Sequence, residues 1–239
     1  MFHQRRIESL GRIKLSQLIS KKNPYLFRAK GFTNSKELIG ALLDAWISSS
    51  EEGKFGKFLE DLAVFVAQTT SGGEKSPAEG IDLDLTRDGI RYLIVVKSGN
   101  AWGNNDQHKR LHDNLRKAEQ VLKQSKFTKP IQSTLGICYG KFQKKHKRHY
   151  LHVGGKDFWE LVSGDPEFYA DVMTPLGAGA DEHRRKFDKA REETIARLSD
   201  EFDAQFKDNS GEIDWAGVVK FVCCPPTRRT RAARTKAEV

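Results

Sequence analysis

The chain has 239 residues, and its 41 Lys and Arg residues outnumber its 32 Asp and Glu residues, which gives a formal net charge of +9. This positive surplus favours a polyanionic partner, most often nucleic acid. Cys138, Cys223 and Cys224 have neither the number nor the spacing of a disulfide framework or a zinc site. This cysteine usage is typical of a reduced, cytoplasmic protein. No uninterrupted apolar run reaches the roughly 18 residues of a membrane span, so we expect no membrane partner.

The N-terminal third is expected to be helical. Apolar residues at helical spacing predict a helix over about the first 20 residues, which Asn23-Pro24 should end before a loop. Ser35 is the predicted N-cap of a second helix, which the serines at 48–50 should end. A third helix is expected from Phe55 to Ala67, followed by a polar loop.

A β-hairpin is predicted next, from Gly80–Leu85 and Tyr92–Gly99. Asp82 stands near the start of its first strand, and Lys97 ends the apolar run of its second strand. Charged side chains are rarely buried unless they are paired or bind a metal. A Mg²⁺-dependent nuclease site would account for both residues. The simpler alternative is that Lys97 is the first solvated residue after a buried strand and Asp82 belongs to an ordinary turn.

The remaining predicted elements are both helices and strands. After a polar loop, the pattern predicts helices and strands in this order: a helix at 106–124, a strand at 131–140, a basic loop at 141–149, a strand at 150–153, and helices at 156–162, 166–174, 181–207 and 213–222. This order predicts an α/β fold with a mixed sheet. The basic segment 225–239 has little to bury and is expected to be disordered.

Several motifs, taken together in order, resemble a known family. They are the hairpin and the segments Asn23–Phe27, Phe55–Glu60, Ala78–Leu83, Trp102–Asn104, Cys138–Gly140 and Gly155–Trp159. Over residues 2–222 the chain is similar to PmeII-like type II restriction endonucleases of the PD-(D/E)xK nuclease superfamily. The resemblance implies a restriction-endonuclease-like core, with a mixed β-sheet flanked by helices and with further N-terminal and C-terminal helices. It also implies one domain over 1–222, with a helical part at 1–70, the catalytic sheet core at 78–162 and C-terminal helices at 165–222.

The resemblance implies Mg²⁺-dependent, sequence-specific hydrolysis of double-stranded DNA, with Asp82, Lys97 and Glu60 as catalytic residues. The superfamily places an acid two residues before the lysine, where this chain has Val95. Another carboxylate must therefore help Asp82 to bind the metal.

Glu60 is the first choice for that second carboxylate, and Glu79 and Asp84 are the alternatives. Asp84 shares a strand face with Asp82, so the two are also considered as a pair. The backbone carbonyl of Val95 or Val96 is a further candidate metal ligand.

DNA contacts are expected from two regions. The side chains of Asn104, Asn105 and Gln107 suit adenine edges, or they serve only the loop that contains them. Phosphate contacts are expected from basic residues of the following helix and of the basic loop, namely Lys109, Arg110, Arg116, Lys117, Lys141, Lys144, Lys145, Lys147 and Arg148. His108 and His112 have metal-ligand spacing, but with no third ligand we expect a plain surface pair.

A homodimer is expected, because a twofold-symmetric DNA site needs one active site for each strand. Two other functions remain open. The chain is alternatively a repair or recombination nuclease that recognises DNA structure, or a degenerate protein that binds DNA without cutting it because Val95 replaces an acid.

Overall fold

The structure is a computed structural model that describes residues 2–125, 127–141, 144–147 and 149–225. By contacts the chain divides into two compact units, one comprising Met1–Glu51 and Asp181–Val239 and the other Glu52–Ala180. The expectation of one domain over 1–222 stays a prediction. Arg148 and almost all of the basic tail lie outside the described residues. No described helix is long and apolar enough to cross a membrane.

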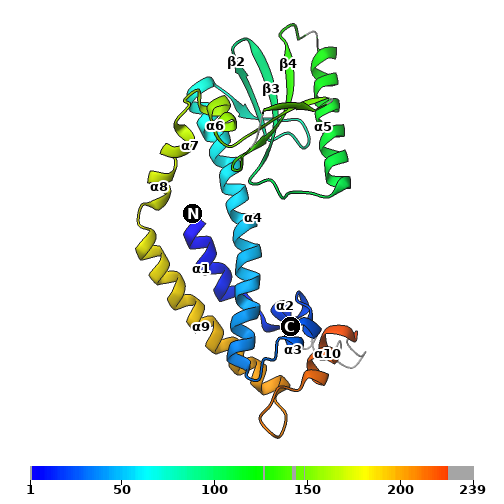
Figure 1. Ribbon diagram of the computed structural model, residues 1–239, viewed down its shortest axis with the longest axis vertical. Coiled ribbons are helices and arrows are strands. Elements are labelled where there is room, and N and C mark those ends of the chain that lie inside the picture. The colour runs from blue at the N-terminus through cyan, green and yellow to red at the C-terminus, as the bar shows by residue number, and fades with distance from the viewer. Residues whose placement is uncertain (1, 126, 142–143, 148, 226–239) are drawn as a thin grey trace, which may run out of the picture. The chain divides into compact units, whose positions relative to one another are not determined.

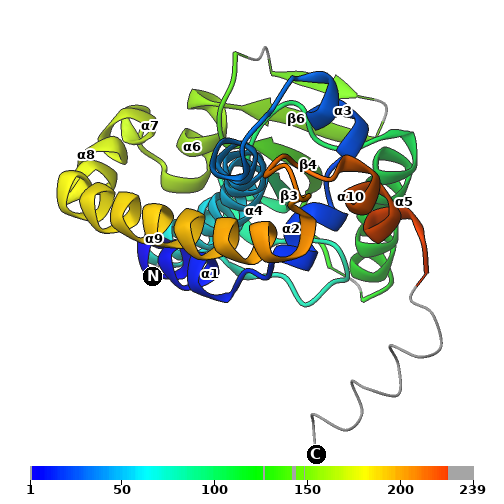
Figure 2. The same ribbon diagram turned by 90° about the horizontal axis from the view of Figure 1, so that it is seen from below.

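The first unit is helical. Its elements are α1 (Phe2–Arg12), α2 (Leu15–Ser20), α3 (Pro24–Ala29), the first part of α4 (Ser35–Ser71), most of α9 (Ala180–Phe206) and α10 (Trp215–Cys223). Buried apolar side chains from these helices, such as Leu18, Ile39, Leu43 and Phe202, form its core. Figure 2 shows α1 beside α9, where the Arg6 guanidinium lies 3.9 Å from the centre of the Phe187 ring.

Three sequence-based boundaries in this region are wrong. Asn23-Pro24 does not open a loop but starts α3, because Asn23 Oδ1 accepts hydrogen bonds from the backbone of Tyr25 (3.0 Å) and Leu26 (3.4 Å). The expected first helix is instead two, since α1 ends at Arg12 and α2 begins at Leu15. The serines at 48–50 lie inside α4, where Ser49 Oγ donates to the Ala45 carbonyl, so this hydroxyl finds its partner within a continuous helix.

The second unit contains a six-stranded sheet in the order β1-β2-β3-β4-β6-β5. The strands are β1 (Glu74–Lys75), β2 (Leu83–Arg87), β3 (Ile90–Lys97), β4 (Ile131–Ile137), β5 (Lys145–Lys147) and β6 (Tyr150–Gly154). The pairs β3–β4 and β4–β6 are parallel and the others antiparallel, so the mixed sheet is confirmed. β2 and β3 form the predicted hairpin, and both turn residues, Asp88 and Gly89, have positive φ, as a two-residue hairpin turn requires.

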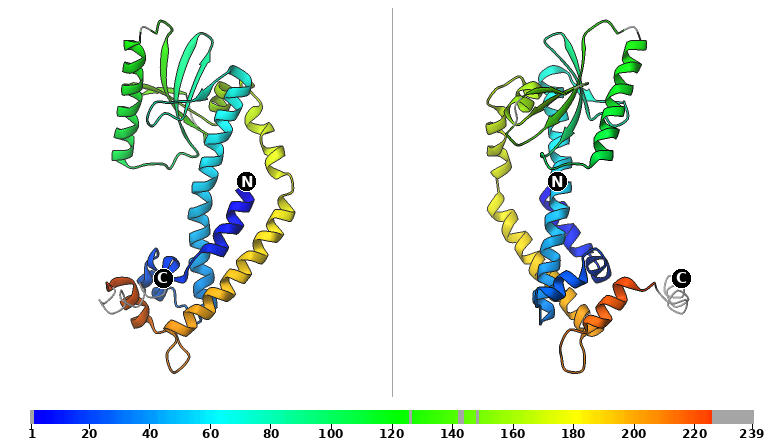
Figure 3. Two further views of the ribbon diagram at one scale, coloured as in Figure 1. Left: turned by 180° about the vertical axis from the view of Figure 1, so that it is seen from behind. Right: turned by 45° about the vertical axis from the view of Figure 1, so that its right-hand side comes forward.

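Helices cover both faces of this sheet (Figures 1 and 3). The helices of the unit are the second part of α4, α5 (Asn105–Gln124), α6 (Lys156–Ser163), α7 (Phe168–Asp171) and α8 (Met173–Gly177). Leu93 and Val95 of β3 pack with α5, while Ile94 and Val96 pack with α4 and α6. Because β3 is covered on both sides, its run of apolar residues is continuous, and this run is the pattern that predicted the strand.

Candidate active site

The hairpin fixes the carboxylate of Asp82 against the neighbouring strand. Leu83 pairs with Ile94 in the β2–β3 ladder, and one residue earlier the backbone N–H of Asp82 donates to the Ile94 carbonyl (2.9 Å). The Asp82 side chain then accepts a hydrogen bond at Oδ2 from the backbone N–H of Val96 (2.8 Å). Oδ1 accepts no hydrogen bond from the described residues, so this oxygen is available to a further ligand.

Four charged side chains interact at this point. Burial is the main effect on Asp82 and raises the pKa of its carboxyl, and the charge of Glu60 raises it further. The Val96 N–H, Lys97 and Lys57 act in the opposite direction and favour the ionised form. Glu60 and Lys97 thus lie close enough to Asp82 for their charges to act on its pKa, while the catalytic role of the three residues stays a prediction.

Glu60 comes to the site on α4. Its Oε1 lies 2.5 Å from Lys57 Nζ, and the same ammonium lies 2.9 Å from Asp61. Burial raises the pKa of the Cys138 thiol to about 12, and the charge of Glu60 adds to this rise, which places Glu60 near the end of β4 as well.

Lys97 is held at the end of β3 by the adjacent strand and loop. Its carbonyl accepts from the backbone N–H of Cys138 (2.9 Å), and its Nζ lies 5.6 Å from the centre of the Trp102 ring. The Trp102 ring also contacts His108, with ring centres 4.4 Å apart. An ammonium group over an aromatic ring is attracted to the face of the ring, which restricts the directions in which it points.

The three alternative metal ligands, Asp84, Glu79 and Val95, have different surroundings. Asp84 is buried and its carboxylate is held by Arg91, with Nε at 2.9 Å from Oδ1 and Nη2 at 2.8 Å from Oδ2. This ion pair accounts for Asp84 without a metal. Glu79 is exposed in the turn before Asp82, and its charge is not among those that shift the pKa of Asp82. The Val95 side chain is buried in the core beneath α5, so only its backbone carbonyl can serve as a ligand.

The expected DNA-reading residues lie at the start of α5. Asn104 Oδ1 accepts from the Gln107 N–H (3.0 Å), and Gln107 Oε1 accepts from the Asn104 N–H (2.9 Å). In this capping box both side chains hold the start of α5, which is the alternative to reading DNA bases. The two roles compete, because adenine readout needs the same amide oxygens. The other predicted contacts are exposed on α5 or in and beside β5, namely Asn105, Lys109, Arg110, Lys144, Lys145 and Lys147.

Two residues near Asp82 and Lys97 were not predicted. Lys57 precedes Glu60 by three residues, a helical spacing at which an ion pair is expected, so its role could have been found from the sequence. Trp102 could not, because its approach to Lys97 depends on the path of the loop.

The residues at this site suit Mg²⁺, which takes oxygen ligands and keeps several waters. Asp82 offers a desolvated carboxylate with an oxygen that no described donor satisfies, and Glu60 offers a second carboxylate. Within the described ranges, no three His, Cys, Asp or Glu side chains gather into a preformed metal cluster. Waters and a backbone carbonyl would therefore have to complete the set.

Comparison with known proteins identifies the family of the chain. The family model for type II restriction endonuclease EcoO109I matches residues 1–184, about three quarters of the chain. No curated protein matches the chain. The predicted identity as a type II restriction endonuclease is thereby confirmed, while the PmeII-like group stays a prediction. The chain belongs to the EcoO109I family of type II restriction endonucleases.

Proposed function

We propose that this restriction endonuclease hydrolyses double-stranded DNA at a specific sequence with Mg²⁺ as its cofactor, and that its specificity is PmeII-like. The observation that carries the proposal is the proximity of Asp82, just before β2, to Glu60, within α4, and to Lys97, at the end of β3. Two acids and a lysine at the end of a sheet suit phosphodiester hydrolysis, because the transition state gathers negative charge that cations must stabilise.

Asp82 and Glu60 would hold the metal, with the backbone carbonyl of Val95 or Val96 as a further ligand. When bound, Mg²⁺ would polarise the scissile phosphate and lower the pKa of a water molecule. Lys97 orients the attacking water or donates to the phosphate oxygens, and its contact with Trp102 limits the directions in which its ammonium points. Lys57 balances the charge of Glu60 before the metal binds.

The proposal includes a homodimer that presents one active site to each strand of a twofold-symmetric DNA sequence. The cytoplasm is the proposed location, since the substrate DNA is there. The exposed cations of α5 and β5 are proposed to contact the DNA phosphates.

The test is digestion of plasmid and phage DNA with purified protein and Mg²⁺, beside Asp82→Ala and Lys97→Ala, with sequencing of the product ends. Discrete fragments that share one palindromic sequence, absent with both variants, support the proposal. Smeared or structure-dependent products would favour a repair or recombination nuclease. Salt-sensitive DNA binding without any cleavage would mean that the missing acid at Val95 has left a DNA-binding protein with no activity.

A further inference from the structure

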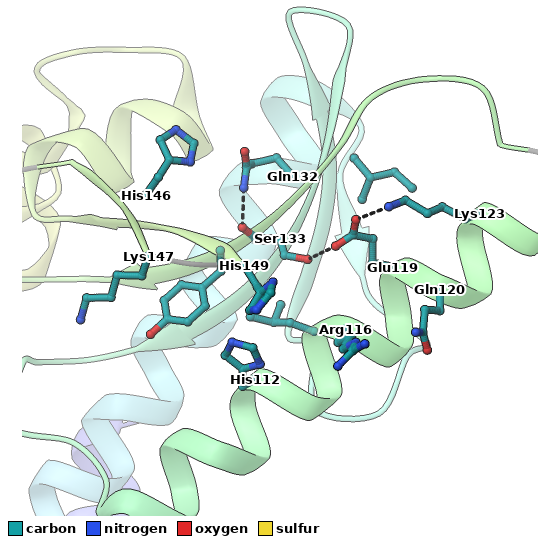
Figure 4. A pocket seen from close by; sticks show the side chains of 13 residues that line it. His112, Arg116, Glu119, Gln120, Lys123, Gln132, Ser133, His146, Lys147 and His149 are labelled. Atoms are coloured by element: carbon teal, nitrogen blue, oxygen red, sulfur yellow. Dashed lines mark hydrogen bonds and ion pairs between the residues drawn. The ribbon is translucent and has the colours of Figure 1, made fainter.

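A pocket of about 510 Å³ opens between α5, the first half of β4 and the β5–β6 hairpin (Figure 4). None of Asp82, Glu60 and Lys97 lines it. The register of β4 with β3 pairs Ile131 with Arg91 and Ile137 with Lys97, so the pocket lies toward the end of the sheet away from the catalytic lysine. It is a separate feature that the proposed chemistry does not use.

The lining of the pocket is rich in groups that donate hydrogen bonds or carry positive charge. His112 and His149 lie side by side in Figure 4, with ring centres 4.7 Å apart and perpendicular planes. Arg116 from α5 and Lys147 from β5 also line the pocket. These two cations form no ion pair with any acid in the described part of the chain.

The acid in the pocket is already compensated. Glu119 lies 2.6 Å from Lys123 Nζ through Oε1, and its Oε2 accepts a hydrogen bond from Ser133 Oγ (3.3 Å). Figure 4 shows both interactions on the side of the pocket that Lys123 borders. The net charge left to a ligand is therefore that of Arg116 and Lys147, which suits an anion with several oxygen acceptors.

The position of the pocket on α5 connects it with the active site. His108, which contacts Trp102 beside Lys97, is followed at intervals of four residues by His112 and Arg116. Residues four apart lie on one face of a helix, so these side chains form one row. Eight residues of helix rise about 12 Å, which equals the axial length of roughly three to four nucleotides of one DNA strand.

We propose that this pocket binds a phosphate of the DNA backbone about three to four nucleotides from the scissile bond. Arg116 and Lys147 neutralise the phosphate, and the imidazole N–H groups of His112 and His149 donate to its oxygens. The inference rests on the proposed function for its ligand, since a nuclease holds the strand on either side of the cut. The proposed function has the exposed cations of α5 and β5 contact DNA phosphates in general. The present inference goes further, because it names one pocket, its four side chains and the position of its phosphate, a contact that carries affinity but no sequence information.

The first experiment measures DNA affinity as a function of salt without divalent cations, so that no cleavage is needed. The proteins are the wild type, Arg116→Gln/Lys147→Gln, and the control Arg184→Gln, which removes one exposed charge on α9. The salt slope of the double variant should be smaller by about 2, one for each lost contact. Between 50 and 200 mM salt its affinity should then fall about 16-fold less than that of the wild type, while the control keeps the wild-type slope.

The second experiment locates the contact with methylphosphonate linkages, which lack the phosphate charge. One neutral linkage about three to four nucleotides from the cut should weaken binding by the wild type and make no difference to the double variant. Equal slopes for all three proteins, or a neutral linkage that acts equally on wild type and variant, would overturn the inference. Binding of inorganic phosphate by the wild type with an unchanged DNA slope would overturn it in favour of a small-anion site.

The two proposals fail in different ways. A wild type that cuts no DNA but shows the predicted slope change would remove the proposed function and keep a DNA phosphate at the pocket. A wild type that cuts discrete sites while the slopes stay equal would remove the pocket and leave the proposed function intact.

Discussion

The ion pair between Asp84 and Arg91 is expected to stabilise the sheet rather than to bind a metal. Replacing Arg91 with Met keeps an apolar stem against Phe127, whose ring centre lies 4.7 Å from the guanidinium, but leaves the Asp84 carboxylate without its partner. The Asp84 side chain is only 8% exposed and that of Arg91 24%. Removing one partner of a buried ion pair destabilises a protein by about 3–5 kcal/mol, and the partial hydration of Arg91 places our expectation near 3 kcal/mol.

Urea unfolding followed by circular dichroism measures this loss. With a slope of about 1–3 kcal/mol per molar urea, the midpoint should fall by about 1–3 M. The matched control is Asp84→Leu/Arg91→Met, in which no charge is left unpaired, and most of the lost stability should return. This double variant should also still cut DNA, because Asp84 holds no metal in our proposal.

Two results would refute this reasoning. A loss of less than about 1 kcal/mol in Arg91→Met would show that the pair behaves as a solvated surface interaction. A double variant that regains stability but loses Mg²⁺-dependent cleavage would show that Asp84 takes part in the chemistry.

Three further predictions concern the interior of the same unit. Burial raises the pKa of Asp82, so the folded chain binds a proton more readily than the unfolded chain, and stability is lost as the pH rises through and above the ordinary aspartate range. Asp82→Asn keeps an acceptor for the Val96 N–H, so it should raise the melting temperature in EDTA at pH 7 and lose this gain below pH 4. The variant should also abolish any stabilisation by Mg²⁺. A variant that melts at a lower temperature than the wild type at pH 7 would contradict the sign of this effect. Burial raises the pKa of the Cys138 thiol to about 12, so this thiol should resist iodoacetamide at pH 8 in the native protein while the two exposed cysteines react. Mass spectrometry before and after unfolding counts the labelled cysteines, and labelling of Cys138 in the native protein would count against its burial. A Cβ on Gly136 would collide with the Phe158 ring, so Gly136→Ala should lower the free energy of unfolding by about 1–3 kcal/mol in the same urea assay. An unchanged free energy would mean that the Phe158 ring can move aside.

The sheet could be predicted from the sequence because its pattern is local. The run from Leu93 to Val96 is buried on both sides of the sheet and is therefore continuously apolar. The continuity of α4 through the serines at 48–50 was harder to predict, since serines taken alone favour caps and turns. Their place inside a helix depends on apolar residues before and after them, which pack in both units.

The candidate site was predictable in part for a similar reason. Asp82 and Lys97 belong to one hairpin, so their proximity follows from its register. Glu60 came from the family resemblance rather than from spacing, because more than 20 residues separate it from Asp82. The His112–His149 contact could not be predicted, since it joins α5 to the segment between β5 and β6 through tertiary packing.

The hydrogen bond from Val96 N–H to Asp82 gives the hairpin a second role. The hydrogen bond next to the end of the β2–β3 ladder is made by the Asp82 side chain, which is proposed to hold the metal. Correct pairing of β2 with β3 therefore also positions the proposed metal ligand. A slip of one residue between β2 and β3 would turn each side chain to the opposite face, and Asp82 would lose the Val96 N–H and the reach of Lys97 together. Under the proposed function, a misregistered chain would therefore lose both of these groups at once and could not cut DNA.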